Sequence, residues 1–177
     1  MKVIAIGGLP ASGKSTLIKN LRKKLDKPKL FKYGLLKGEN YDDLYILGTY
    51  NKKFGGTDTL SYAVQPHAQK FLKLMQNQNC TVLYEGDRLF NMSFIKHIKK
   101  MKYKHKLYML KAKQNTLEIR HKERNDTQSS VWLQGRETKL NRIFAAYEEN
   151  IVLLDNENKQ NMKQNEHKIW QDLKNIT

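Results

Sequence analysis

The feature that most constrains this chain is the segment at residues 8–15, GLPASGKS, which fits the pattern G-x-x-x-x-G-K-[ST]. A short apolar run at 3–6 precedes it and predicts a strand, and apolar residues with helical spacing follow it over 17–25. This succession of strand, loop and helix is the context that a phosphate-binding loop requires. Its glycines let the backbone turn tightly and bring N–H groups against phosphate oxygens, while the start of the helix adds a positive dipole end. The sequence therefore predicts that the chain binds a nucleoside triphosphate.

The residues of this loop have separate expected tasks. Lys14 should reach the β- and γ-phosphates, and the hydroxyl of Ser15 should hold Mg²⁺. Asn156, which follows the last expected strand, is a candidate for contact with the adenine side of the nucleotide because of its position. The expected cofactors are ATP and Mg²⁺, and the residues expected to bind them are Gly8, Ala11, Ser12, Gly13, Lys14, Ser15, Thr16 and Asn156.

Strand-like and helix-like segments alternate along the rest of the chain. With a phosphate loop after the first strand, this alternation predicts an α/β fold: a three-layer P-loop NTPase in which helices cover both faces of a mostly parallel sheet. Residues 30–36 and 44–50, separated by a turn-like stretch at 38–43, are expected to form a hairpin beside that sheet. The other expected strands are 81–84, 106–110 and 151–154, and the expected helices begin near residue 65 or span 94–101, 116–124, 136–147 and 161–174.

The charge balance is the unusual part of the composition. The 177 residues, enough for one domain, include 33 Lys and Arg against 17 Asp and Glu, a formal net charge of +16. Eleven of the basic residues fall between Lys96 and Arg124, where the acids are Glu118 and Glu123. Such an excess favours a polyanionic partner, with nucleic acid as the first candidate. The alternative is a basic surface that is only solvated.

No apolar run approaches the length that crosses a bilayer, and the N-terminus lacks the layout of a signal peptide. The single cysteine, Cys80, cannot form an internal disulfide and is expected to be a small core residue. We therefore expect a cytoplasmic protein with no membrane partner. The oligomeric state stays open.

Three carboxylates compete for the catalytic and metal-binding work. Glu85 and Asp87 come directly after the buried run at 81–84, where a phosphate-loop protein places the carboxylate linked to Mg²⁺. Asp58 lies in a Gly-containing loop that could cover the acceptor, meaning the substrate hydroxyl that would receive a transferred phosphoryl group. We favour Asp58 for contact with the acceptor, Glu85 or Asp87 for base or metal work, and Ser15 with Asp87 as the metal-binding residues.

An arginine-rich segment between the late strands predicts a helical lid at about 115–140 that closes over the triphosphate. The planar, permanent charge of arginine can neutralise a transferring phosphoryl group. The alternative is a helix whose arginines pair with Glu118 or Glu123. Arg88 is expected to hold an acceptor phosphate, or else to pair with Asp87. The expected catalytic residues are Lys14, Asp58, Glu85, Asp87, Arg88, Arg120, Arg124 and Arg136.

Four segments carry a resemblance to a known family: 8–15, 55–66 (GGTDTLSYAVQP), 85–89 (EGDRL) and 132–136 (WLQGR). Together they resemble small bacteriophage-type P-loop kinases, and within that group they are most similar to kinases that phosphorylate 5-hydroxymethyluracil in phage DNA. The resemblance covers roughly the first 140 residues. It implies the kinase type of the P-loop fold, transfer of the γ-phosphoryl group of ATP to a hydroxyl on DNA, and, if a bacteriophage encodes the chain, a location in the host's cytoplasm. Thr59 departs from the pattern, which has an arginine after the aspartate.

Two other functions stay open. One is a nucleoside or nucleotide kinase that acts on a free small molecule, and the other is a nucleic-acid-binding ATPase. A GTPase is disfavoured, because residues 51–54, NKKF, lack the aspartate of the base-reading motif N-K-x-D. Aromatic side chains that could stack on an acceptor base, unless they belong to the core, are Tyr33, Tyr41, Tyr45, Tyr50, Phe54 and Tyr62.

Overall fold

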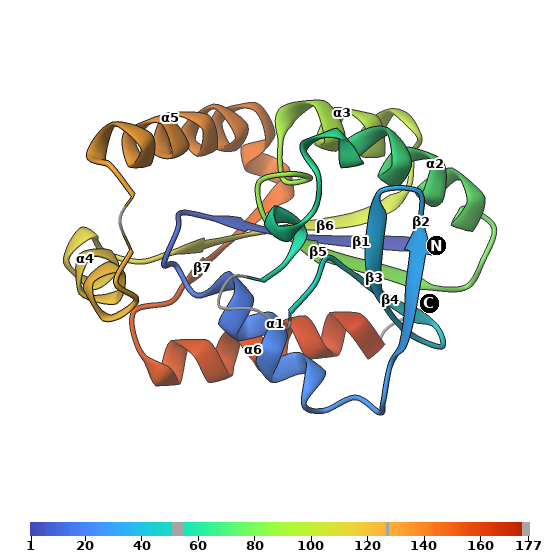
Figure 1. Ribbon diagram of the computed structural model, residues 1–177, viewed down its shortest axis with the longest axis horizontal. Helices are drawn as coiled ribbons and strands as arrows, with labels where there is room; N and C mark the ends of the chain where they lie inside the picture. The colour runs from blue at the N-terminus through green and yellow to red at the C-terminus, as the bar shows by residue number, and fades with distance from the viewer. Residues whose placement is uncertain (51–54, 127, 175–177) are drawn as a thin grey trace.

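A computed structural model of the chain describes residues 1–50, 55–126 and 128–174. This part of the chain forms a seven-stranded sheet with helices on both of its faces (Figure 1). The strands are β1 (Lys2–Gly8), β2 (Lys29–Tyr33), β3 (Leu36–Tyr41), β4 (Leu44–Leu47), β5 (Thr81–Glu85), β6 (Lys104–Lys111) and β7 (Ile151–Asp155). The α-helices are α1 (Lys14–Arg22), α2 (Gln65–Met75), α3 (Met92–Lys100), α4 (Gln114–Glu123), α5 (Ser130–Tyr147) and α6 (Lys159–Lys174), with short 3₁₀ turns at Thr57–Thr59, Tyr62–Val64 and Glu148–Asn150.

The sheet is mostly parallel, as the alternation of elements predicts. Its strand order is β2-β3-β4-β5-β1-β6-β7, and the pairs from β4 through β7 are all parallel. The strands β2, β3 and β4 pair antiparallel at one edge. Because β1 lies between β5 and β6, the loops that follow these strands meet at one edge of the sheet.

Strand β1 shows why the fold has three layers. Its residues alternate between two apolar clusters, with Val3 and Ala5 in one and Ile4 and Ile6 in the other. The first cluster takes in side chains of α2, α3 and α5, and the second takes in those of α1 and α6. Figure 1 shows these two sets of helices on opposite faces of the sheet. The predicted α/β, three-layer architecture is therefore confirmed.

The predicted hairpin is wrong: the expected strand at 30–36 is divided by a turn at 34–35, and the segment forms a three-stranded meander. Residues 38–43 were expected as a turn, but β3 extends to Tyr41 and the turn is confined to 42–43, where Asp42 has a φ of 61°. The strand was hidden because it carries the charged residue Glu39 on a buried position. Arg22 of α1 binds both carboxylate oxygens of Glu39, at 2.6 and 2.5 Å, and Tyr41 donates a third hydrogen bond at 2.7 Å.

One helix start also needs correction. Helix α5 begins at Ser130 instead of residue 136, because the side chain of Ser129 accepts a hydrogen bond from the backbone N–H of Trp132 and caps the helix. Trp170 is half-buried at the border of the core, with the ammonium groups of Lys24 and Lys174 over its ring. Cys80 is buried, as expected. Within the described residues, no helix has the length and apolarity needed to pass through a membrane.

The buried ion pair of Arg22 and Glu39 ties the meander to the helix that begins at the phosphate loop. We expect Arg22→Ala to lower the free energy of unfolding by about 3 kcal/mol, because it leaves a buried carboxylate without its partner. Urea denaturation measures this loss. Lys23→Ala, at the exposed neighbouring position, is the matched control. A loss equal to that of the control would show that the pair contributes nothing to stability.

Candidate active site

The phosphate loop lies between β1 and α1 and has an unusual backbone. Gly8, Ala11 and Gly13 all have positive φ, at 142°, 61° and 98°. A side chain at Gly8 would meet the carbonyl oxygen of Leu110 at 2.6 Å, and one at Gly13 would meet the side-chain nitrogen of Asn156 at 2.3 Å. Both glycines are therefore required by packing as well as by conformation, and successive backbone N–H groups in such a turn form a cradle for an anion.

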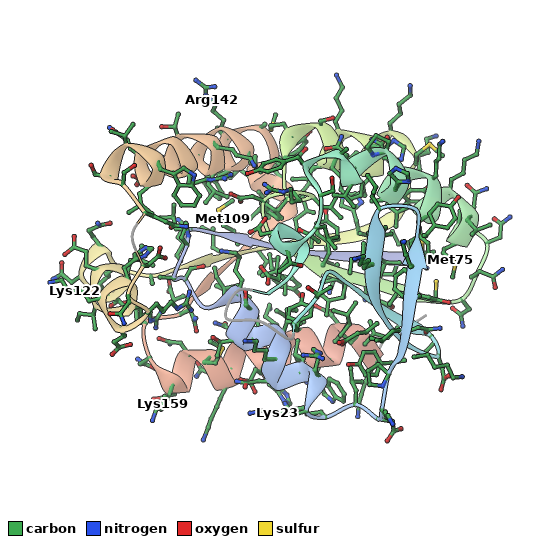
Figure 2. The ribbon with its side chains drawn as sticks, viewed as in Figure 1. Lys23, Met75, Met109, Lys122, Arg142 and Lys159 are labelled. Carbon is green, nitrogen blue, oxygen red and sulfur yellow. The ribbon has the colours of Figure 1, made fainter. Side chains whose placement is uncertain are left out.

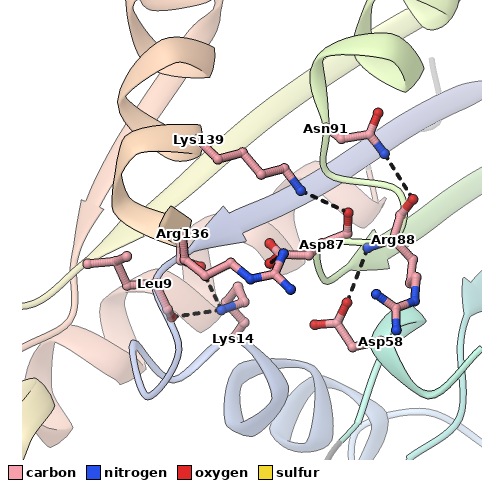
Figure 3. A network of polar contacts seen from close by, with 9 residues as sticks. Leu9, Lys14, Asp58, Asp87, Arg88, Asn91, Arg136 and Lys139 are labelled. Atoms are coloured by element: carbon pink, nitrogen blue, oxygen red, sulfur yellow. Dashed lines mark hydrogen bonds and ion pairs between the residues drawn. The ribbon is translucent and has the colours of Figure 1, made fainter. Parts of the chain in front are cut away.

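Lys14 starts α1 and lines the same cradle. Its Nζ donates hydrogen bonds to the carbonyl oxygens of Gly8 and Leu9, each at 2.8 Å (Figure 3). The ammonium group is thus held over the loop. From there it can exchange these carbonyl partners for phosphate oxygens when a nucleotide binds.

The next residue, Ser15, faces a carboxylate at the end of β5. Its hydroxyl donates a 2.7 Å hydrogen bond to Oε1 of Glu85, which is 1% exposed. Burial raises the pKa of Glu85 to about 7; Asp58 and Asp87 add to this, while Lys14 and the Ser15 hydrogen bond oppose it. A hydroxyl and a carboxylate oxygen are hard ligands of the kind that Mg²⁺ prefers, so this pair fits the expected metal.

Asp58 lies opposite the phosphate loop, in the turn Thr57–Thr59, and is exposed there. Its Oδ1 accepts a 3.1 Å hydrogen bond from the backbone N–H of Arg88 (Figure 3). Crowding by neighbouring atoms removes part of its water and raises its pKa; the charge of Asp87 also raises the pKa, against Lys14 and Arg88. The site therefore holds a carboxylate that is open to a substrate and more basic than usual.

Asp87 makes a different set of contacts. Its carboxylate forms an ion pair with Arg136 of α5, and its backbone carbonyl accepts a 3.2 Å hydrogen bond from Lys139 (Figure 3). Burial lowers the pKa of Lys139, against the charge of Asp87. Lys139 was missing from the sequence prediction. Its spacing of three residues from Arg136, one helical turn, was the available signal.

These residues surround one pocket of 440 Å³ at the carboxyl edge of the parallel strands, within the usual size range of ligand sites. Its lining brings together the phosphate loop, the carboxylates and three arginines that are far apart in sequence: Gly8, Pro10, Ala11, Gly13, Lys14, Ser15, Gly55, Asp58, Thr59, Tyr62, Glu85, Asp87, Arg88, Arg124, Asp126, Gln128, Trp132 and Arg136.

Comparison with known proteins agrees with this geometry. The sequence matches the family described as P-loop Nucleotide Kinase3 over residues 1–155. The chain belongs to this family of P-loop nucleotide kinases.

Two solved structures resemble the kinase. One is an unliganded sugar kinase from Janibacter sp. HTCC2649, with a TM-score of 0.54, 11% identity, and coverage of 98% of this chain and 96% of that one. The other is deoxyadenosine kinase from M. mycoides with bound dATP, with a TM-score of 0.49, 19% identity, and coverage of 98% and 99%. At such identity the first likeness shows a shared fold alone. No curated protein matches the kinase in sequence.

The expected lid arginines of the kinase divide into two kinds. Arg124 and Arg136 line the pocket. Arg120 instead donates to the backbone carbonyls of Asn156 and Glu157, at 2.8 and 3.1 Å, and to that of Ala11 at 3.4 Å. It joins the phosphate loop to residues 156–157 and does not line the pocket, and among the described residues no ion pair links it to a glutamate of its helix.

Asn156 also supports the loop from behind. It is completely buried, and its side-chain amide donates a 2.7 Å hydrogen bond to the carbonyl oxygen of Ser12. The expected contact with adenine is therefore wrong for this conformation, because no part of the side chain is accessible. Ser12 is likewise buried, whereas Thr16 is exposed on α1 outside the lining of the pocket.

The expected stacking aromatics also separate. Tyr62 is 84% exposed at the pocket, and the guanidinium of Arg88 lies 3.4 Å from the centre of its ring. Trp132, which sequence reasoning left out as a stacking residue, lines the other side with Arg136 at 4.5 Å. Tyr33 and Tyr45 pack against Phe71, Tyr41 binds Glu39 and Tyr50 is buried, so these four are structural.

Two further points concern the loop before the pocket. The hydroxyl of Thr59 donates to the carbonyl of Gly56 at 2.7 Å and accepts from Thr49 at 2.8 Å, so the residue that replaces the expected arginine holds the loop together. Residues 51–54, including Phe54 and the NKKF segment, lie outside the described residues.

The buried Glu85 predicts a pH dependence of stability. Its pKa in the folded state, about 7, is above the ordinary value of 4.5, so the folded state binds the proton more tightly than the unfolded state does. The free energy of unfolding should then fall by about 3 kcal/mol as pH rises from 4.5 through 7. Glu85→Gln should remove this slope, whereas Glu123→Gln, at an exposed position, should keep it. Unfolding curves across this pH range measure both, and an unchanged slope in Glu85→Gln would refute the assignment.

Proposed function

We propose that this kinase transfers the γ-phosphoryl group of ATP to a hydroxyl group on a nucleic acid, with 5-hydroxymethyluracil in DNA as the specific acceptor that the sequence resemblance suggests. The observation that carries the proposal is that groups suited to a phosphate donor and groups suited to a hydroxyl acceptor line the same pocket. Lys14, Ser15 and Glu85, which we call the donor wall, line it together with Asp58 and the pocket arginines, which we call the acceptor wall. A phosphate donor and a hydroxyl acceptor can therefore meet between them.

On the donor wall, Lys14 and the backbone N–H groups of the phosphate loop hold the β- and γ-phosphates. Ser15 and Glu85 would hold Mg²⁺, in place of the expected pair Ser15 and Asp87, because the carboxylate of Asp87 is occupied by Arg136. When bound, the ion would neutralise charge on the phosphate oxygens. The pKa of Glu85, about 7, means that this carboxyl loses its proton within the neutral range.

On the acceptor wall, Asp58 orients the hydroxyl and takes its proton. The acceptor oxygen forms a bond to the γ-phosphorus, the bond from that phosphorus to the bridging oxygen breaks, and ADP leaves with the electron pair. Asp58 suits this task because it is exposed to the pocket and its pKa is raised. Its hydrogen bond from the N–H of Arg88 fixes its position.

Arg88, Arg124 and Arg136 supply positive charge around the transferring group. All three line the pocket from different segments, and the guanidinium group stabilises phosphoryl charge without forming covalent bonds. Arg124 and Arg136 belong to the segment at about 115–140, which we propose acts as the lid. Its contact with the Asp87 loop, through Arg136 and Lys139, is the point at which it closes on the site.

Two aromatic rings at the pocket favour an acceptor that carries a base. Tyr62 and Trp132 are both exposed, and each has an arginine over its face. Such rings can stack on a nucleobase, and a base within a duplex would have to be extruded to reach them. The pocket volume of 440 Å³ also suits a free nucleotide, so a kinase of free nucleotides is the second candidate.

The basic block at residues 96–124 does not by itself mark the acceptor site. The structure distributes this block over α3, both ends of β6, and α4. Its members therefore lie at opposite ends of strand β6. Only Arg124 of the block lines the pocket. The argument for nucleic acid therefore rests on the pocket and not on the total charge.

The first test is an acceptor panel with labelled γ-phosphate. It contains DNA with 5-hydroxymethyluracil, unmodified DNA with 5′-hydroxyl ends, and free nucleosides and nucleotides. We expect label on the hydroxymethylated DNA, and we expect Lys14→Ala to abolish transfer while the circular dichroism and Tm stay unchanged. Lys27→Ala, at an exposed position, is the matched control. Label on free nucleotides alone would support the second candidate, and full activity of Lys14→Ala would overturn the site.

A second prediction concerns the base. Asp58→Asn keeps the shape and the acceptor atom for the N–H of Arg88 but cannot take a proton, so kcat should fall about 10²–10⁴-fold. ATP affinity, measured by titration, should stay close to that of the unmodified protein. Asp26→Asn is the exposed control. A kcat equal to that of the control would assign proton transfer to another group.

A further inference from the structure

Helix α5 carries a line of basic residues that runs from the pocket to the outer surface. Arg136, Lys139 and Arg142 follow at intervals of three residues, a rise of about 4.5 Å each along the helix. Arg136 lines the pocket, and Lys139 contacts the carbonyl of Asp87. Arg142 is exposed and points away from the body of the molecule (Figure 2). The proposed reaction uses only the first of these residues directly.

A groove of 460 Å³ accompanies this line, between α5 and the start of α3. It begins next to the Asp87 loop, because Lys139 belongs both to the groove and to the contact with Asp87. Its described lining contains two cationic side chains, three neutral polar ones and no carboxylate. The lining residues are Asn91, Met92, Ser93, Gly135, Thr138, Lys139 and Arg142.

Gly135 lies on the side of α5 that lines the groove. A glycine inside a helix lowers stability relative to alanine. An added Cβ at Gly135 would meet no atom within 4 Å. Packing within the described chain therefore gives no reason for this glycine. Its effect is to leave the floor of the groove bare, so that a ligand can lie close to the helix.

We propose that this groove binds the sugar–phosphate backbone of a polynucleotide acceptor, on one side of the nucleotide whose hydroxyl enters the pocket. This inference rests on the proposed function. Lys139 and Arg142 would contact phosphates, and the hydroxyl of Ser93, which accepts a hydrogen bond from Gln65, would donate its own hydrogen to a phosphate or sugar oxygen. A free nucleotide would occupy the pocket and leave the groove unused. The groove therefore distinguishes a polymeric acceptor from a monomeric one.

The test compares two acceptors that carry the same base: a short single-stranded oligonucleotide with one central 5-hydroxymethyluracil, and the free nucleotide. For Arg142→Glu we expect the ratio of kcat/KM for the oligonucleotide to that for the nucleotide to fall about tenfold, with a reduction of the salt slope of oligonucleotide binding by about one. Lys163→Glu makes the same change of charge at an exposed position on α6, across the sheet, and should leave the ratio unchanged.

Gly135 supplies a second variant. Gly135→Phe should fill the groove and lower the ratio. An unchanged ratio in both Arg142→Glu and Gly135→Phe would overturn the groove assignment while the kinase activity stands. Phosphorylation of the free nucleotide with none of the oligonucleotide would also overturn it.

Failure of the proposed reaction itself has a separate signature. If neither acceptor receives label, fluorescence anisotropy of the labelled oligonucleotide still decides whether the groove binds nucleic acid. Weaker binding by Arg142→Glu, with unchanged binding by Lys163→Glu, would support the groove. Equal binding by the two variants would refute it.

Discussion

The hydrogen bond from Ser15 to Glu85 is the contact on which the site depends. It joins the start of α1 to the end of β5, and thereby fixes the phosphate loop against the neighbouring strand. Gly56, in the loop after β4, lies so close to Glu85 that an added Cβ would be 2.2 Å from the carboxylate. The donor wall is therefore densely packed. It keeps the carboxyl group of Glu85 away from water, and this burial raises the pKa of that group.

The acceptor wall is assembled from segments that are distant in sequence. Asp58 comes from the loop after β4, Arg88 from the loop after β5, and Arg136 from α5. Only parallel pairing brings these segments to one edge of the sheet. The contacts of Arg136 and Lys139 with Asp87 then connect α5 to the catalytic loop, so the helix that carries the proposed nucleic-acid groove is joined directly to the site of transfer.

Sequence reasoning was accurate where a residue type is required by local chemistry. Glycines at 8 and 13, the lysine at 14 and the alternating apolar residues of β1 all followed from backbone conformation and burial, which act over a few residues. It failed where a polar residue is buried by a distant partner. Glu39 concealed β3 because its partner, Arg22, lies on α1, and Asn156 and Arg120 were assigned to the nucleotide although both hold the back of the phosphate loop.

The sequence by itself determined the phosphate loop, the class of fold and the group of residues from which the site is built. Only the tertiary structure decided which carboxylate faces Ser15, which arginines reach the pocket and that Lys139 joins them. The physical reason is that a strand or loop sets the spacing of its own side chains, whereas the choice between Glu85 and Asp87 depends on α5, which arrives more than forty residues later and takes Asp87 for its own ion pair.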